Sequence, residues 1–110
     1  MGATLLDCYR IGDAQGPALD FVRKNIDVDI YDVNGVEWVR ANQKGVSVRS
    51  VIHRLRNPMF RWWKLPGGTS YPASLDMYND HGNHWMFVPV TDMPLVDYIA
   101  QLGIVNQGFV

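Results

Sequence analysis

The sequence predicts a single α+β domain made of many short strands with two or three short helices. Its 110 residues have room for one domain rather than two. Apolar residues make up 47% of the chain, which is typical of a protein that folds around a core and not of a disordered one. Short runs of β-favouring residues recur between glycine, proline and asparagine, and this pattern indicates strands joined by turns.

The strands are predicted from β-favouring residues that end at turn signals. The first strand covers residues 4–11 and ends at Gly12. Residues 27–33 alternate as a half-buried strand or an extended loop would, and Asn34-Gly35 is a strong hairpin signal between them and a strand over 36–40. Four further strands are expected over residues 46–48, 60–65, 74–78 and 84–90, with a loop over 79–83 between the last two.

Two helices are predicted, and a third segment is ambiguous. Residues 17–24 place Leu19 and Val22 on one side behind Pro17, which favours a short helix. Residues 49–56 are ambiguous: Val51, Ile52 and Leu55 suit one helical face, which Pro58 would end.

The last helix carries the clearest signals. Asp92 suits the N-cap, and the apolar residues Leu95, Ile99 and Leu102 recur at helical spacing. Gly103 is suited to the C-terminal end of this helix. Residues 104–110 are expected to form a loose tail.

Charge is segregated along a chain whose net charge is −1. Residues 1–37 hold seven acidic side chains, and residues 38–64 hold seven basic ones and no acid. From Leu65 onward there are four aspartates and no base. The fold therefore either exposes a cationic face or brings together strands whose charges cancel.

The composition also limits location and cofactors. Cys8 is the only cysteine, so no intrachain disulfide is expected. No apolar run of about eighteen residues exists to cross a bilayer, and we expect a cytoplasmic protein with no membrane partner. One cysteine with His53, His81 and His84 is too few and too badly spaced for a metal signature, since Gly82 and Asn83 separate the last two in a loop.

Three polar residues are candidates for a site. Arg10 is the only base in an otherwise largely apolar strand, where its planar guanidinium suits a pyrophosphate. Ser47 lies between two valines and could point its hydroxyl into a cleft, and His84 opens an apolar strand directly after a loop. Ordinary solvent-facing side chains are the alternative at all three positions.

Aromatic side chains could form a stacking wall for a nicotinamide or a nucleobase. The group comprises Trp62, Trp63, Tyr71 and Trp85. Because neighbouring residues of a strand point to opposite faces, at most one of Trp62 and Trp63 faces a given cleft. The alternative is that most of these rings belong to the core.

Several motifs follow one another in a distinctive order. They are Cys8-Tyr9-Arg10, Gly45-Val46-Ser47, the stretch Trp63-Lys64-Leu65-Pro66-x-Gly68-Thr69-x-x-Pro72-x-x-Leu75, Asp80, and His84-Trp85-Met86-Phe87-Val88-Pro89 before Met93 and a terminal helix. In this order and spacing, residues 5–102 resemble the type VI secretion exported toxins of the effector-two family. The resemblance implies a compact ADP-ribosyltransferase-like fold in which two small antiparallel or mixed sheets surround a cleft.

The resemblance also implies a function and a site. It implies a bacterial toxin that uses NAD, with Arg10, Ser47 and His84 as catalytic residues. The implied cofactor-binding residues are Tyr9, Arg10, Ser47, Trp63, Asp80 and Trp85. The implied partners are NAD, an immunity or antitoxin protein that plugs the cleft, and a macromolecular acceptor that the sequence does not identify.

The chain departs from that pattern at the catalytic carboxylate. Many ADP-ribosyltransferases place a glutamate against the nicotinamide ribose, whereas the only glutamate here is Glu37, which precedes the serine strand. Asp80 is the nearest substitute, and Val46 stands where the family has threonine. Transfer, hydrolysis of NAD and binding without turnover all stay open.

Two other functions stay open. The basic segment 38–64, interleaved with aromatic residues, suits an RNA-binding or RNA-cleaving toxin. Alternatively, the tryptophans could anchor a protein partner in a module without enzymatic activity.

Overall fold

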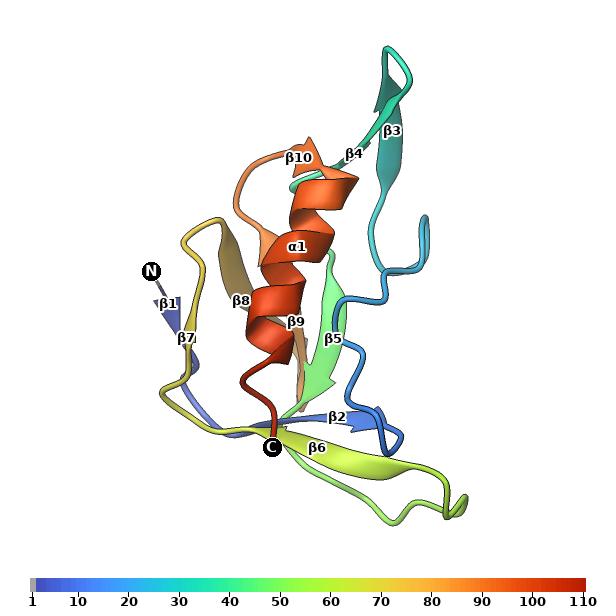
Figure 1. The fold of residues 1–110 in the computed structure, drawn as a ribbon. Coiled ribbons are helices and arrows are strands. Elements are labelled where there is room, and N and C mark those ends of the chain that lie inside the picture. The colour runs from blue at the N-terminus through green and yellow to red at the C-terminus, as the bar shows by residue number, and fades with distance from the viewer. Residues whose placement is uncertain (1) are drawn as a thin grey trace.

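The computed structural model describes residues 2–110 as ten short strands and one helix (Figure 1). The strands are β1 (Gly2–Ala3), β2 (Cys8–Gly12), β3 (Ile30–Val33), β4 (Val36–Val39), β5 (Val46–Arg49), β6 (Arg61–Leu65), β7 (Ser70–Tyr71), β8 (Leu75–His81), β9 (His84–Pro89) and β10 (Met93–Pro94). Helix α1 covers Leu95–Asn106. The predicted α+β class is therefore confirmed, with one helix among these residues rather than two or three.

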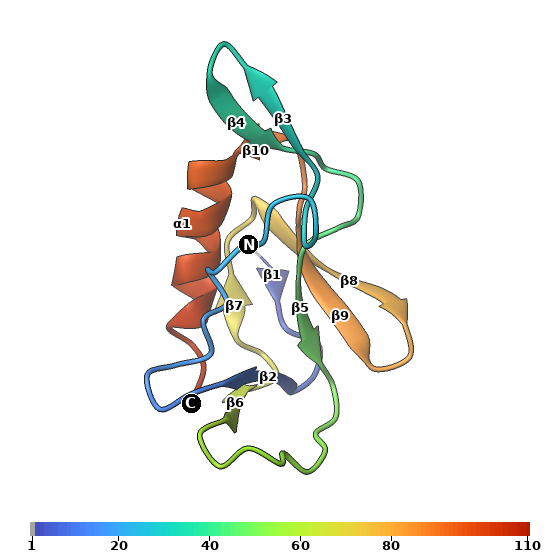
Figure 2. The ribbon, with the colours of Figure 1, turned by 90° about the vertical axis from the view of Figure 1, so that its right-hand side faces the viewer.

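The strands form three antiparallel sheets. The largest has the order β6-β2-β5-β9-β8, the second β10-β4-β3, and β1 pairs with β7. The β3–β4 hairpin projects from the body in both views (Figures 1 and 2). In Figure 2, α1 runs along one side of the molecule and the tips of β8 and β9 point away on the other.

The core lies between α1 and the five-stranded sheet. One face of the helix buries Leu95, Tyr98, Leu102 and Val105, as its periodicity predicts. The valines of β5 and Phe87 of β9 belong to the same buried cluster. Within residues 2–110, no helix is long and apolar enough to span a bilayer.

The helix predicted over residues 17–24 is wrong. Ala18 has a φ of 51°, a left-handed conformation that ends a right-handed helix at its second residue. Leu19 is fully buried, and its N–H donates to Oδ1 of Asn106 at 2.8 Å. A long-range hydrogen bond to α1 thus replaces the local helical one.

The helix considered over residues 49–56 does not form either. Arg49 ends β5 and the rest of the segment is irregular. Val51 and Ile52 are about half exposed, at 49% and 56%. The apolar face is therefore left largely exposed, whereas most of a helix's stability comes from packing such a face.

The limits of α1 and the tail also differ from the prediction. Pro94 precedes the first helical residue, and Asp92 instead accepts hydrogen bonds from Ala41 N and Tyr31 Oη, both at 2.7 Å. Gly103 lies inside the helix. The tail is held rather than loose, since Phe109 is buried and Val110 exchanges two backbone hydrogen bonds with Lys64.

The strand boundaries shift in two places, and short strands also form that were not predicted. The strand predicted over 4–11 is shortened to β2, because residues 4–7 bend and belong to no strand. The loop predicted over 79–83 shrinks, because β8 continues to His81 and leaves Gly82 and Asn83 as the turn. The short strands β7 and β10 carry no pattern long enough to be noticed in the sequence.

Candidate functional site

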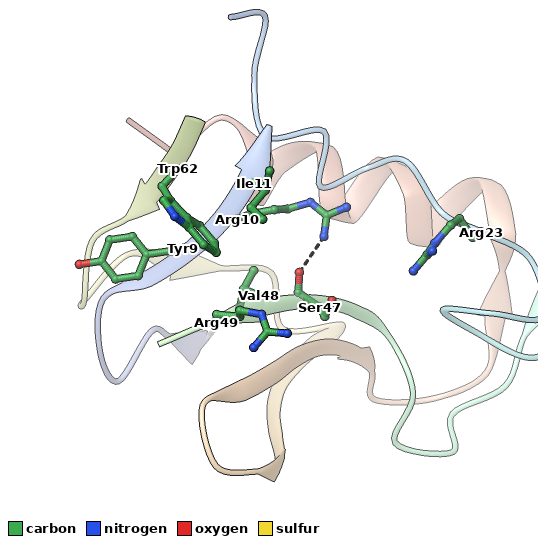
Figure 3. Close-up of a pocket in the computed structure, with 8 residues that line it drawn as sticks. All are labelled: Tyr9, Arg10, Ile11, Arg23, Ser47, Val48, Arg49 and Trp62. Carbon is green, nitrogen blue, oxygen red and sulfur yellow. Dashed lines mark hydrogen bonds between the residues drawn. The ribbon is translucent and has the colours of Figure 1, made fainter. Parts of the chain in front are cut away.

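A cavity of about 440 Å³ lies over the junction of β2 and β5 (Figure 3). Its volume is within the range of small-molecule sites. It is lined by Tyr9, Arg10, Ile11, Arg23, Ser47, Val48, Arg49 and Trp62. Three of these residues, Tyr9, Arg10 and Ser47, are ones that the family resemblance implicates.

Strand register explains how this face is built. Tyr9 lies opposite Arg49, and Arg49 lies opposite His84 on its other side. Residues opposite one another in a ladder share a face, as do residues two apart in one strand. Tyr9, Arg49 and His84 therefore form a row across β2, β5 and β9, with Ser47 on the same face beside it. We call this the outer face of the sheet.

Arg10 lies on the opposite, inner side of β2 and acts as a clamp. Only one residue pair joins β2 to β5, so the strands separate after Tyr9. The guanidinium of Arg10 fills the gap and donates to the carbonyl oxygens of Ser47 at 2.7 Å, Pro17 at 2.8 Å and Ala18 at 3.4 Å. Burial lowers the pKa of Arg10.

The other two arginines of the cavity differ in their partners. Arg23 forms two hydrogen bonds to the Asp27 carboxylate, at 2.9 and 3.3 Å, and is thereby neutralised. Arg49 is exposed and forms no ion pair or side-chain hydrogen bond within residues 2–110. Arg49 is thus the arginine whose guanidinium is available to a ligand. It was not among the residues predicted for the site, although its spacing of two from Ser47 within one strand signals a shared face.

The tryptophans divide between the two faces. Trp62 lines the cavity and donates its Nε1–H to the carbonyl oxygen of His53 at 2.7 Å. Trp63 and Trp85 pack against the core instead, and neither is among the described residues that line the cavity. The expectation that only one of Trp62 and Trp63 faces the cleft is confirmed, and the one that does is Trp62.

A second cavity of about 260 Å³ adjoins the first. It is lined by Arg23, Ile26, Asp27, Lys44, Gly45, Ser47, His84 and Met86. Because Arg23 and Ser47 line both cavities, the two meet at these residues, and we call the pair the elongated depression. The three residues predicted as catalytic all line it: Arg10 lines the first cavity, His84 the second, and Ser47 both.

The carboxylates near this depression are Asp80 and Asp27. Asp80 Oδ1 lies 2.6 Å from Nδ1 of His84, and its Oδ2 lies 3.1 Å from Nδ1 of His81. Desolvation raises the pKa of Asp80, but hydrogen bonds and charge from His84 and His81 outweigh it and hold the pKa below its ordinary value. Glu37 lies on the projecting hairpin and pairs with Lys24 at 2.7 Å.

The turn between β8 and β9 creates a cluster that sequence spacing did not reveal. One ligand atom from each of Asp80, His81 and His84 lies within 4.8 Å of the others. The imidazole rings of His81 and His84 stack with centroids 5.2 Å apart. No metal site was predicted from the sequence, because these residues were expected in a loop rather than on a tight hairpin.

The lysines and the arginines of the basic segment differ in their ion pairs. Lys44 and Lys64 pair with Asp29 and Asp7, so part of the charge of segment 38–64 is cancelled by the amino-terminal acids. In contrast, no ion pair within residues 2–110 involves any arginine of the stretch from β5 to β6, namely Arg49, Arg54, Arg56 and Arg61.

Comparison with protein-family models, with curated proteins and with solved structures finds no match to this chain.

Proposed function

We propose that this chain is an NAD-dependent ADP-ribosyltransferase-like toxin that binds the dinucleotide along the outer face of β2, β5 and β9. One observation carries the proposal: the register row Tyr9–Arg49–His84, with Ser47 beside it. It brings three residues that the family resemblance implicates to one face, next to an arginine without an acidic partner. The elongated depression suits an extended ligand with two nucleoside ends and a pyrophosphate between them.

The residues divide the binding of such a ligand between them. The planar guanidinium of Arg49 holds the pyrophosphate, because it can form paired hydrogen bonds to phosphate oxygens. The hydroxyl of Ser47 hydrogen-bonds a ribose. Tyr9 and Trp62 supply aromatic surface for a base. Arg10 shapes the cleft, since three carbonyl groups already occupy most of its donors.

The proposed reaction breaks the bond between nicotinamide and the ribose anomeric carbon. The electron pair of that bond leaves with nicotinamide, and an acceptor or water adds to the same carbon and loses a proton. Positive charge develops on the ribose ring, so positioning and electrostatic stabilisation contribute more than a covalent nucleophile. Asp80 and the His84 that it orients supply the polar groups at that end.

The test measures NAD affinity and nicotinamide release in matched arginine variants. Arg49→Ala is expected to weaken NAD binding about 10- to 100-fold, since it removes charge-assisted hydrogen bonds. Arg56→Ala, an exposed arginine outside both cavities, is expected to bind as the parent does. The proposal fails if NAD leaves the melting temperature of the parent unchanged at millimolar concentration, or if both variants respond alike.

Expression in a bacterial host tests the toxin assignment separately. Growth inhibition from the cytoplasm is expected to disappear in Ser47→Ala and Arg49→Ala variants that remain folded. A cognate immunity or antitoxin protein would cover the outer face and compete with NAD. An inhibitor of toxicity that leaves NAD binding unchanged contradicts that mode of protection.

A second candidate function is RNA binding through the segment from Arg49 to Arg61. The observation that favours it is the row of arginines without acidic partners, next to the exposed apolar side chains Met59 and Phe60. Cationic side chains without partners near aromatic surface suit a phosphate backbone and unstacked bases.

The salt dependence of RNA affinity tests this candidate separately from NAD binding. A combined R54A/R56A/R61A variant is expected to reduce the slope of log affinity against log salt by about one for each phosphate that it no longer neutralises. Ser47→Ala should leave RNA affinity unchanged. RNA affinity that scarcely depends on salt excludes this candidate, while NAD binding is decided by the separate assay above.

A further inference from the structure

The tip of the β8–β9 hairpin brings two imidazoles to one carboxylate. Asp80 and His81 end β8, and His84 begins β9 after a two-residue turn in which Gly82 has a φ of 47°. Both Nδ1 atoms face Asp80, one on each oxygen, at 2.6 Å for His84 and 3.1 Å for His81. The tight turn thus gathers three donor side chains within residues 80–84.

We propose that Asp80, His81 and His84 form a three-ligand site for a divalent cation of the zinc class. Imidazole nitrogen together with carboxylate oxygen is a ligand set that Zn²⁺ takes, whereas Mg²⁺ and Ca²⁺ prefer oxygen alone. Three protein ligands leave a coordination position for water, as open zinc sites do. This inference does not depend on NAD binding.

The separations suit a bound cation. Bonds of about 2.0–2.2 Å in tetrahedral geometry put ligand atoms about 3.4 Å apart, and all three donor atoms lie within 4.8 Å of one another. His84 and Asp80 need a small rotation apart, because their present contact is a hydrogen bond. The exposed position of His81, whose side chain is 77% accessible, leaves the site open to ions from solvent.

The surroundings fix the turn and set the local charge. The side-chain amide of Asn79 donates to the carbonyl oxygens of Gly82 and His84, at 3.1 and 2.9 Å, which holds the turn in its present shape. Arg49 lies opposite His84 in the ladder and its charge opposes a cation. The charge of Asp80 has no partner within residues 2–110 other than the two histidines.

Calorimetric titration of the tag-free chain with Zn²⁺ at neutral pH tests the proposal. The parent is expected to bind one ion saturably and to gain melting temperature on binding. Asp80→Asn and His81→Ala should each lower the affinity about tenfold or more, because each removes one ligand. His53→Ala and Asp97→Asn remove the same kinds of side chain at exposed positions elsewhere and should bind as the parent does.

Other results overturn the proposal. Equal Zn²⁺ affinity in Asp80→Asn and in Asp97→Asn would show that binding is not at the hairpin. Failure of the parent to bind Zn²⁺, or competition by an equal concentration of Mg²⁺, would do the same. Because both hairpin substitutions lie at the exposed tip, circular dichroism of each variant checks that a lost signal does not reflect unfolding.

Discussion

The two faces of β5 and β9 differ in what their residues do. On the inner face, Val46, Val48 and Phe87 are almost fully buried, with 2% or less exposed. On the outer face, Ser47, Arg49 and His84 point to the two adjoining cavities or to solvent. In β5, buried valines therefore alternate with candidate functional residues, so substitutions at neighbouring positions of that strand should have opposite consequences. In β9, Met86 and Val88 are buried as well.

The largest effect is expected from Phe87→Ala on the inner face. Removing this fully buried ring, which also packs edge-on against Tyr71 at 5.7 Å, should lower the free energy of unfolding by about 3–5 kcal/mol. Urea denaturation measures the loss. A loss below about 1 kcal/mol would mean that the inner face is not the stabilising one.

Arg10→Ala should have the next largest effect and sharpens the comparison, because Arg10 on the inner side of β2 is hydrogen-bonded to the backbone of Ser47 in β5. It leaves three carbonyl groups without their donor and should cost about 2–3 kcal/mol. Arg10→Lys should recover only part of this, since an ammonium cannot reproduce the guanidinium fork. A variant as stable as the parent that has nevertheless lost NAD binding would assign Arg10 to the ligand and not to the clamp.

Tyr98→Phe removes a buried hydroxyl from behind the inner face. That hydroxyl donates to Phe87 O at 2.6 Å and accepts from Val46 N at 3.1 Å, and burial raises the pKa of Tyr98 well above its usual value. The change should cost about 1–3 kcal/mol. Tyr78→Phe, on β8, is the control and should cost much less. Equal losses would contradict the role of the buried hydroxyl.

Cys8 gives a pH-dependent comparison within β2, where it faces inward and Tyr9 outward. Burial raises the pKa of the Cys8 thiol from 9.0 to about 11. A raised folded-state pKa contributes stability that is complete below the unfolded value and is lost as pH rises through the folded one. Stability should therefore fall by about 2 kcal/mol between those two values.

Cys8→Ala provides the control for this alkaline loss. Urea denaturation below and within that pH window should show a smaller fall in the alanine variant than in the parent. In the folded parent, the thiol should also resist labelling at neutral pH until the chain unfolds. Rapid labelling of the native state would contradict the burial of Cys8.

The smallest effects on stability are expected on the outer face. Ser47→Ala and Arg49→Ala should change the free energy of unfolding by less than about 0.5 kcal/mol, because neither side chain is buried. The same variants should lose ligand affinity, which is the opposite of the inner-face pattern. Thermal melts with and without NAD measure both quantities. Large destabilisation by Arg49→Ala would contradict the assignment of stability to the inner face and ligand binding to the outer face.

The sequence could predict those features that depend on neighbours along the chain. The strand in which Ser47 lies between two valines, the hairpin at Asn34-Gly35 and the apolar periodicity of α1 all follow from local spacing, and the structure confirms them. The failed helix at residues 17–24 had a good local pattern. It failed because the side chains of Arg10 and Asn106 satisfy its backbone groups from elsewhere.

By itself, then, the sequence determined which residues alternate, where the clearest turn falls and that Ser47 lies between two inward valines. Only the tertiary structure decided that Arg10 is engaged by carbonyl groups while Arg49 is available, and that Asp80 meets two histidines. The physical reason is that backbone preference and burial follow from local spacing. The partner of a charged or hydrogen-bonding group is instead chosen among residues far apart in the chain, such as Arg10 and Ser47.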